Sequence, residues 1–258
     1  MMKNFLLPIF FGGCNFCNAQ QIKNLVMQKD SVAIVKTISK KTVIKTLIAP
    51  AALITYGFVT LKTKELKQLD KNTQFEIKED HPKFITKIDN YLQFSPSIAV
   101  YGLNISGIKG KNNLSDRIMI YGLSTMISST AVFSIKRITK IERPDGSGVN
   151  SFPSGHTATA FAAAEFLRQE YKDVSAWYGI AGYTAALATG IIRLYNNKHW
   201  VSDVVAGAGF GIISTKVAYW IYPTIKRKIF KKKNINTVLV PYYFKGGGGL
   251  SMTHNFKR

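Results

Sequence analysis

The chain has 258 residues, a formal net charge of +21 and 46% hydrophobic residues. This length and apolar content suffice for one sizeable core or a compact set of membrane helices. The positive charge favours nucleic acid, an anionic membrane surface or an anionic substrate as partner. No recognised nucleic-acid-binding motif accompanies the charge, so a dedicated nucleic-acid binder is disfavoured.

Residues 1–19 resemble a bacterial export signal, with Lys3 ahead of an apolar stretch and a cleavage site after Ala19. Both cysteines, Cys14 and Cys17, would leave with this segment. Their C-x-x-C spacing has no second pair to complete a zinc site and no strand–helix context for a redox site. A polar N-terminal segment over residues 20–46 follows.

Apolar stretches over the next part of the chain predict an all-α bundle of about six helices. They cover residues 47–61, 95–107, 118–135, 154–170, 174–192 and 201–222. Several of these stretches end in Trp or Tyr, which is typical of membrane interfaces, so we expect the bundle to be membrane-integrated. Several stretches are nevertheless shorter than the roughly 20 residues of a membrane span. Residues 47–224 are thus the predicted helical domain, with a charged connector at 62–90 in which His81 is expected at the surface.

Residues 225–258 form a basic C-terminal tail that carries nine Lys or Arg and no acid. A basic cluster directly after an apolar segment suits anionic lipid headgroups, and it also fits a lysine-rich solvated tail. Two β-prone runs flank residues 246–249, four consecutive glycines, which predicts a hairpin-like tail.

The first motif with chemical content is "KRITKIERP", in which Lys136 precedes Arg143 by seven residues. On a helix this spacing is nearly two turns, so both cations are expected on one face. An ammonium and a guanidinium together suit a phosphate group. The alternative is a basic helix end exposed to solvent.

The second motif, "PSGH", leads into an alanine-rich helix. Ser154 is a candidate N-cap, and Gly155 allows close approach to the backbone N–H groups, which attract anions at a helix N-terminus. His156 would lie beside that anion, where a carboxylate or the phosphate itself keeps it protonated as a general acid. The alternative is an ordinary capped helix with a surface histidine.

The third motif, "RLYNNKHWVSD", contains Arg193, His199 and Asp203. His199 and Asp203 are four residues apart and share a helix face, so the carboxylate can fix the imidazole tautomer and leave the other ring nitrogen as a nucleophile. Arg193 can fold back onto the same phosphate. The alternative is a helix cap with an incidental pair.

In order and spacing, these three motifs resemble the signature of the type 2 phosphatidic acid phosphatases, bacterial non-specific acid phosphatases and vanadium haloperoxidases. The resemblance covers about residues 117–224. One departure is Ile192, where members often have serine before the arginine. It removes a hydrogen bond but no group essential to the chemistry.

The resemblance implies that His199 attacks phosphorus while Asp203 orients it, and that His156 protonates the leaving oxygen. Lys136, Arg143, Ser154, Gly155 and Arg193 are the implied phosphate-binding residues. No metal and no cofactor are implied, and neither a nucleic acid nor an obligate protein partner is expected.

The expected activity is hydrolysis of a lipid-linked phosphomonoester or diphosphate, outside the cytoplasm, through a phosphohistidine. The alternatives are a soluble periplasmic acid phosphatase and a vanadium-dependent haloperoxidase. The expected location is the bacterial inner membrane with a periplasm-facing site, or the periplasm. A cleaved export signal would place the residues before 47 outside the cytoplasm. Six membrane spans with the active site outside the cytoplasm would place the same residues in the cytoplasm. These two predictions exclude each other.

Overall fold

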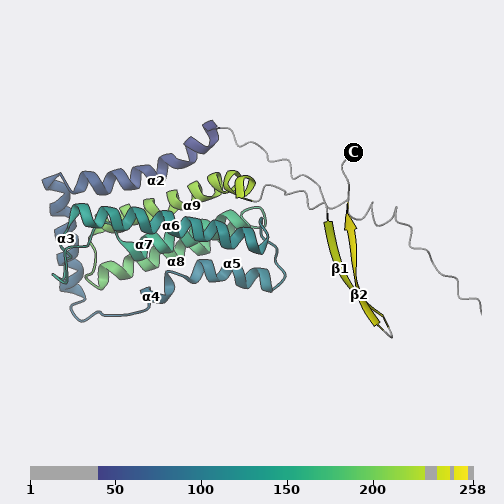
Figure 1. Cartoon of the computed structure of the whole chain (residues 1–258). Helices are drawn as coiled ribbons and strands as arrows, with labels where there is room; N and C mark the ends of the chain where they lie inside the picture. The colour runs from purple at the N-terminus through teal and green to yellow at the C-terminus, as the bar shows by residue number, and fades with distance from the viewer. Residues whose placement is uncertain (1–39, 230–236, 245–246, 255–258) are drawn as a thin grey trace, which may run out of the picture. The chain divides into compact units, whose positions relative to one another are not determined.

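The computed structural model describes residues 40–229, 237–244 and 247–254 (Figure 1). Eight helices follow one another in the first range. They are α2 (Lys40–Thr60), α3 (Lys64–Asp80), α4 (Asp89–Leu92), α5 (Ser95–Ile105), α6 (Leu114–Thr139), α7 (Gly155–Tyr171), α8 (Ala176–Tyr195) and α9 (Val201–Ile229). The predictions for residues 1–39, among them the export signal and most of the polar segment, lie outside the described residues.

The all-α prediction is confirmed, and each of the six apolar stretches coincides with a helix. Two further helices were not predicted: α3 lies within the predicted connector at 62–90, and α4 begins at its end. Helix α3 is charged along most of its length, and its buried side chains are the polar Asp70 and Gln74. Since it packs through polar groups, it has no apolar stripe from which its role could be read.

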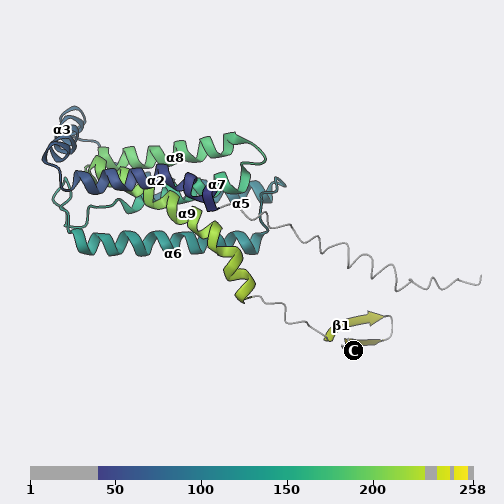
Figure 2. The ribbon, with the colours of Figure 1, turned by 90° about the horizontal axis from the view of Figure 1, so that it is seen from above.

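Helix α7 lies at the centre of the bundle, between α6 and α8 (Figures 1 and 2). Its alanines, among them Ala160 and Ala163, are fully buried. Helix α9 approaches it so closely that a Cβ atom at Gly211 would lie 2.3 Å from the carbonyl oxygen of Ala158. Small residues on both helices therefore let the two backbones touch.

The chain reverses direction between α6 and α7, between α7 and α8, and between α8 and α9, with short connections at the last two. Such neighbours are antiparallel. The C-terminal ends of α6 and α8 and the N-terminal ends of α7 and α9 therefore meet at one end of the bundle. All three sequence motifs lie there.

Among the described residues, two helices are long and apolar enough to cross a membrane, Leu114–Thr139 and Val201–Lys228. The bent pair of α2 and α3 makes a third candidate, with an angle of 95° between its two parts. Large apolar side chains on the outside of the bundle, such as Met126 and Phe133, are more than 60% exposed. An exposed apolar surface of this kind fits contact with lipid.

The tail prediction is confirmed for the described residues, because β1 (Thr237–Phe244) and β2 (Gly247–His254) pair antiparallel. The register pairs Phe244 with Gly247 and Thr237 with His254. The glycines at 247–249 therefore belong to β2, whereas the sequence pattern put them between the strands.

Candidate active site

Lys136 lies in the last turn of α6 and points at the loop that leads to α7. Its ammonium donates to the carbonyl oxygen of Ser151 at 3.0 Å and to that of Asn150. Lys136 thereby ties the end of α6 to this loop. It is one of the ten residues around a pocket that also includes His156.

The expectation that Lys136 and Arg143 share one helix face is wrong. Helix α6 ends at Thr139, because Lys140 takes the left-handed conformation with φ of 48°. Arg143 therefore lies in the loop, where its Nε donates to Asn150 Oδ1 at 2.8 Å. Asn150 accepts from both cations, so the loop, and not a helix, brings them together.

Ser154 caps α7 as the sequence predicts, and it is fully buried. Its hydroxyl oxygen accepts from the Thr157 hydroxyl at 2.9 Å and from the Thr157 N–H at 3.4 Å. Its own N–H donates to the carbonyl oxygen of Asp203 at 3.0 Å. The start of α7 is thereby fastened to the start of α9.

Gly155 follows the cap, and a Cβ atom there would meet only Val132, at 3.9 Å. Packing within the protein therefore does not require glycine at this position. The missing side chain leaves the N–H groups of the first turn open to a ligand.

His156 lies in the first turn of α7, and its Nε2 is 2.8 Å from Asn90 Oδ1. Burial, reinforced by the positive charge of Arg193, lowers the pKa of His156 to about 4. The nearby Asp89 acts in the opposite direction but is outweighed. The expectation that a protein carboxylate keeps His156 protonated is therefore wrong, and the imidazole is neutral at neutral pH unless an anion comes close.

His199 and Asp203 pair as predicted, with Nδ1 and Oδ2 3.2 Å apart. The expectation that they share a helix face is wrong, because α9 begins at Val201 and His199 lies in the segment before it. The same carboxylate oxygen accepts from the Trp200 N–H at 2.9 Å and from the Ser151 hydroxyl. Burial lowers the pKa of His199 to about 4, although Asp203 opposes this shift. The imidazole is therefore neutral, and a proton on Nδ1 leaves a free lone pair on Nε2.

Arg193 lies in the last turn of α8 and is 8% exposed. Its NH1 forms an ion pair with Asp89 Oδ2 at 2.5 Å, while its Nε is buried without a hydrogen-bond partner in the described part of the chain. An unpaired guanidinium N–H in this position is available to an oxyanion.

Three polar residues of the charged connector, two acids and one amide, support this end of the bundle. They were not identified from the sequence. Asp70 on α3 accepts from the N–H of Ser202 at 3.2 Å and from its hydroxyl, which anchors the first turn of α9. Asp89 and Asn90 contact Arg193 and His156. No local pattern reveals these residues, because each acts on a partner more than 60 positions away. Their only signal is polar side chains in a region with no apolar face.

The structure thus gathers all eight predicted site residues at one end of the bundle. By contrast, His81 is exposed as expected, and its ring lies 5.2 Å from that of Tyr195. His254 belongs to β2. In the described ranges, no three His, Cys, Asp or Glu side chains are grouped as ligands of a metal ion.

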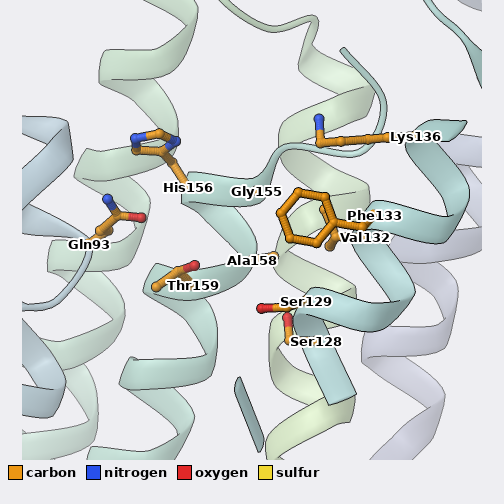
Figure 3. A pocket seen from close by; sticks show the side chains of 10 residues that line it. All are labelled: Gln93, Ser128, Ser129, Val132, Phe133, Lys136, Gly155, His156, Ala158 and Thr159. Atoms are coloured by element: carbon orange, nitrogen blue, oxygen red, sulfur yellow. The ribbon is translucent and has the colours of Figure 1, made fainter. Parts of the chain in front are cut away.

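A pocket of about 200 Å³ leads away from the site between α6 and α7. Figure 3 shows Lys136 and His156 at one level and Ser128 and Ser129 further along the helices. Val132 and Ala158 also line it. A second pocket of about 390 Å³ borders the site on the side of Arg193, Lys198 and Asn90.

Residues 117–227 match the family model described as "PAP2 superfamily". The chain is 42% identical over 149 residues to "Lipid A 1-phosphatase" of Porphyromonas gingivalis, which covers 56% of this chain and 33% of that protein. It is 34% identical over 76 residues to "Bacitracin transport permease protein BcrC" of Bacillus licheniformis, which covers 30% of this chain and 36% of that protein. The chain spans about a third of the length of these curated relatives.

Two solved structures are also similar. LpxE of Aquifex aeolicus matches with a TM-score of 0.43 and 21% identity, over 56% of this chain and 92% of that one. A transmembrane PAP2-type phosphatidylglycerolphosphate phosphatase of Bacillus subtilis matches with a TM-score of 0.46 and 18% identity, over 69% of this chain and 98% of that one.

Proposed function

We propose that this protein is a phosphatase that hydrolyses a lipid-linked phosphomonoester or diphosphate through a phosphohistidine at His199. The match of residues 117–227 to the PAP2 superfamily model supports this proposal. One observation carries the proposal. A buried, neutral imidazole is held by Asp203 at the end of the bundle where Lys136, Arg143 and Arg193 also gather. Such a constellation presents a nucleophile to the centre of a tetrahedral oxyanion.

In the first half of the reaction, His199 Nε2 attacks phosphorus and the bond from phosphorus to the leaving oxygen breaks. The positive charge that develops on the imidazole is stabilised by Asp203 at Nδ1. The leaving oxygen takes its proton from His156. A phosphate dianion beside His156 favours the imidazolium form, which offsets the low pKa that the protein groups alone produce.

In the second half, His156 accepts a proton from water, and the water oxygen attacks phosphorus. The phosphorus–nitrogen bond breaks, and inorganic phosphate leaves with His199 restored. The non-bridging oxygens are held in both halves by Lys136, Arg143, Arg193, the Ser154 hydroxyl and the first N–H groups of α7. These donors stabilise the charge that spreads over the oxygens in the transition state.

A lipid substrate is favoured by the pocket between α6 and α7. It begins at Lys136 and His156 and continues past Val132 and Phe133, so a chain attached to the phosphate can follow apolar side chains. The candidate spans, the exposed apolar surface and a relative named as a lipid A 1-phosphatase favour the same substrate class.

The proposed orientation places the site on the periplasmic side of the inner membrane. Helix α9 starts at the site and carries Lys226, Arg227 and Lys228 in its last turn. Clusters of positive residues next to a span favour the cytoplasmic side. An alkaline phosphatase reporter fused after residue 45 and another after 229 would locate the two ends, and a periplasmic reporter at 229 would contradict the orientation.

The activity is tested with the purified full chain in detergent micelles. We expect phosphate release from lipid phosphates to exceed release from p-nitrophenyl phosphate, and orthovanadate to inhibit it competitively. With a ³²P-labelled lipid phosphate, rapid quenching in alkali should trap an alkali-stable phosphoenzyme, which is characteristic of phosphohistidine.

His199→Ala should remove phosphate release and trapped label together, whereas the exposed His81→Ala should leave both unchanged. A large loss is expected, by about 10³-fold or more, because the nucleophile itself is removed. Wild-type turnover in the His199→Ala protein would exclude the nucleophile assignment. Bromide oxidation by peroxide in the presence of vanadate would instead favour haloperoxidase chemistry.

A further inference from the structure

The segment that joins α3 to α5 is clamped against the end of α8. The side chain of Asn196 accepts from the Thr86 N–H and donates to the Thr86 carbonyl oxygen, both at 2.9 Å. Its amide also lies 3.4 Å from Asp89 Oδ1. This clamp holds the start of α4, where Asp89 is 1% exposed.

Two consecutive side chains of this segment reach two different groups of the proposed reaction. Asp89 pairs with Arg193 NH1 at 2.5 Å, and Asn90 Oδ1 lies 2.8 Å from His156 Nε2. Arg193 comes from α8 and His156 from α7. A single turn of backbone therefore sets the relative position of a phosphate-binding cation and a proton-transferring imidazole.

The contact with Asn90 also decides which nitrogen of His156 exchanges its proton. A carbonyl oxygen can only accept a hydrogen bond, so His156 Nε2 keeps its hydrogen. The proton that leaves and returns during the reaction is then carried by Nδ1. On the other side, Asp89 occupies NH1 of Arg193, and the buried Nε remains without a partner in the described residues.

We propose that Asp89 and Asn90 are positioning residues of this site: Asn90 fixes the tautomer and ring orientation of His156, and Asp89 aims the open edge of Arg193 at the phosphate. This inference rests on the proposed function for its catalytic meaning. Its geometric content, a hydrogen bond from His156 to residue 90, can be tested without any substrate.

The charges that face His156 determine the direction in which a substitution shifts its pKa. Arg193 on α8, Arg143 in the loop and Lys136 on α6 disfavour the imidazolium, and Asp89 on α4 favours it. Asn90→Asp adds a second carboxylate at hydrogen-bond distance with almost no change in shape. An adjacent opposite charge raises the pKa of an imidazole by about 1 unit or more.

The decisive measurement is the pH dependence of kcat for the wild type, Asn90→Asp and the control Asn72→Asp. Asn72 is an exposed residue of α3 whose side chain bonds Gln68, so it carries the same charge change without contacting the site. A general acid must be protonated to act, so kcat falls as pH rises through its pKa. We expect this alkaline limb to move to higher pH in Asn90→Asp and to stay in place in Asn72→Asp.

Two further measurements separate orientation from folding and from the proposed function. Asn90→Leu should lower kcat by up to about 100-fold, with less change in KM, because the ring loses its orientation. NMR titration of His156 in the substrate-free protein should show a higher pKa in Asn90→Asp than in the wild type.

The outcomes distinguish the two proposals. Suppose that the wild type is active and His199→Ala is inactive, but that Asn90→Asp and Asn72→Asp have identical pH profiles. This result overturns the positioning role and still supports the proposed phosphatase activity. A wild type that releases no phosphate from any substrate overturns the phosphatase, and the NMR titration then decides the contact alone. An unchanged pKa of His156 in Asn90→Asp overturns that contact.

Discussion

The two halves of the helical bundle contain similar charged residues but use them differently. In the half away from the site, each buried acid is surrounded by donors. Glu165 accepts from Arg168, Gln169 and Tyr183 and pairs with Lys216, and Glu170 binds Arg117, Asn112 and Tyr219. Each of the cations Arg168, Lys216 and Arg117 has an acidic partner there, and these contacts fasten α6, α7, α8 and α9 to one another.

At the end that holds the candidate site, Arg193 forms an ion pair with Asp89. Lys136 and Arg143 have no ion pair with a described acid and donate to oxygens of the loop before α7. Arg193 Nε and Asp203 Oδ1 are buried without hydrogen-bond partners in the described residues. Such groups cost stability. Arg117 NH1 in the other half is also buried without a partner in the described residues, but only at the candidate site do such atoms occur beside cations that have no acidic partner. The difference between the structural cluster and the candidate binding site is therefore whether each cation has an acidic partner, and not the number of charges.

The largest effect that tests this comparison is expected from Asp203→Asn. The amide carries no negative charge to stabilise the imidazolium that forms at His199, while its volume hardly differs and its oxygen can still accept from Trp200 and Ser151. We expect kcat to fall by about 10³- to 10⁴-fold with an unchanged melting temperature. Phosphate release and circular dichroism on the same sample measure both. Near-normal turnover would mean that Asp203 is structural.

Glu170→Gln should have the opposite profile. The amide leaves Arg117 buried without a counter-charge, and breaking a buried ion pair in this way costs about 3–5 kcal/mol. We therefore expect earlier unfolding in a denaturant series with kcat unchanged at a temperature where the variant is folded. If kcat falls as much as stability, the two halves are coupled, and the Glu170 cluster is not purely structural.

The smallest expected effect concerns acid stability. His199 has a folded-state pKa of about 4, below the ordinary value of 6.5, so the unfolded chain binds a proton that the folded site rejects. Its contribution to stability is complete above pH 6.5 and is lost as pH falls toward 4, by roughly 3 kcal/mol. Thermal unfolding between pH 7 and 4 should show a smaller decline in His199→Gln than in the wild type. Equal declines would place the acid sensitivity elsewhere.

Local patterns were enough to predict part of the site. The cap at Ser154 and the pairing of His199 with Asp203 join residues three or four positions apart, so the sequence alone indicates them. The helical spacing itself did not apply to the pair, because His199 precedes α9. The Lys136–Arg143 pair was predicted correctly as neighbours but for a wrong reason, because the left-handed Lys140 ends the helix before Arg143. A conformation that depends on the contacts of a loop is not visible in residue spacing.

The amino-acid sequence by itself determined the helical class, the six apolar helices and the three motifs, because periodicity, capping and short-range pairing are properties of neighbouring residues. Only the tertiary structure decided that α3 and α4 complete the site through Asp70, Asp89 and Asn90. It also lowered the pKa of His156 and of His199, so that both imidazoles are neutral when only protein groups surround them. Burial and the approach of charges from distant helices set those properties, and neither is encoded in any single stretch of chain.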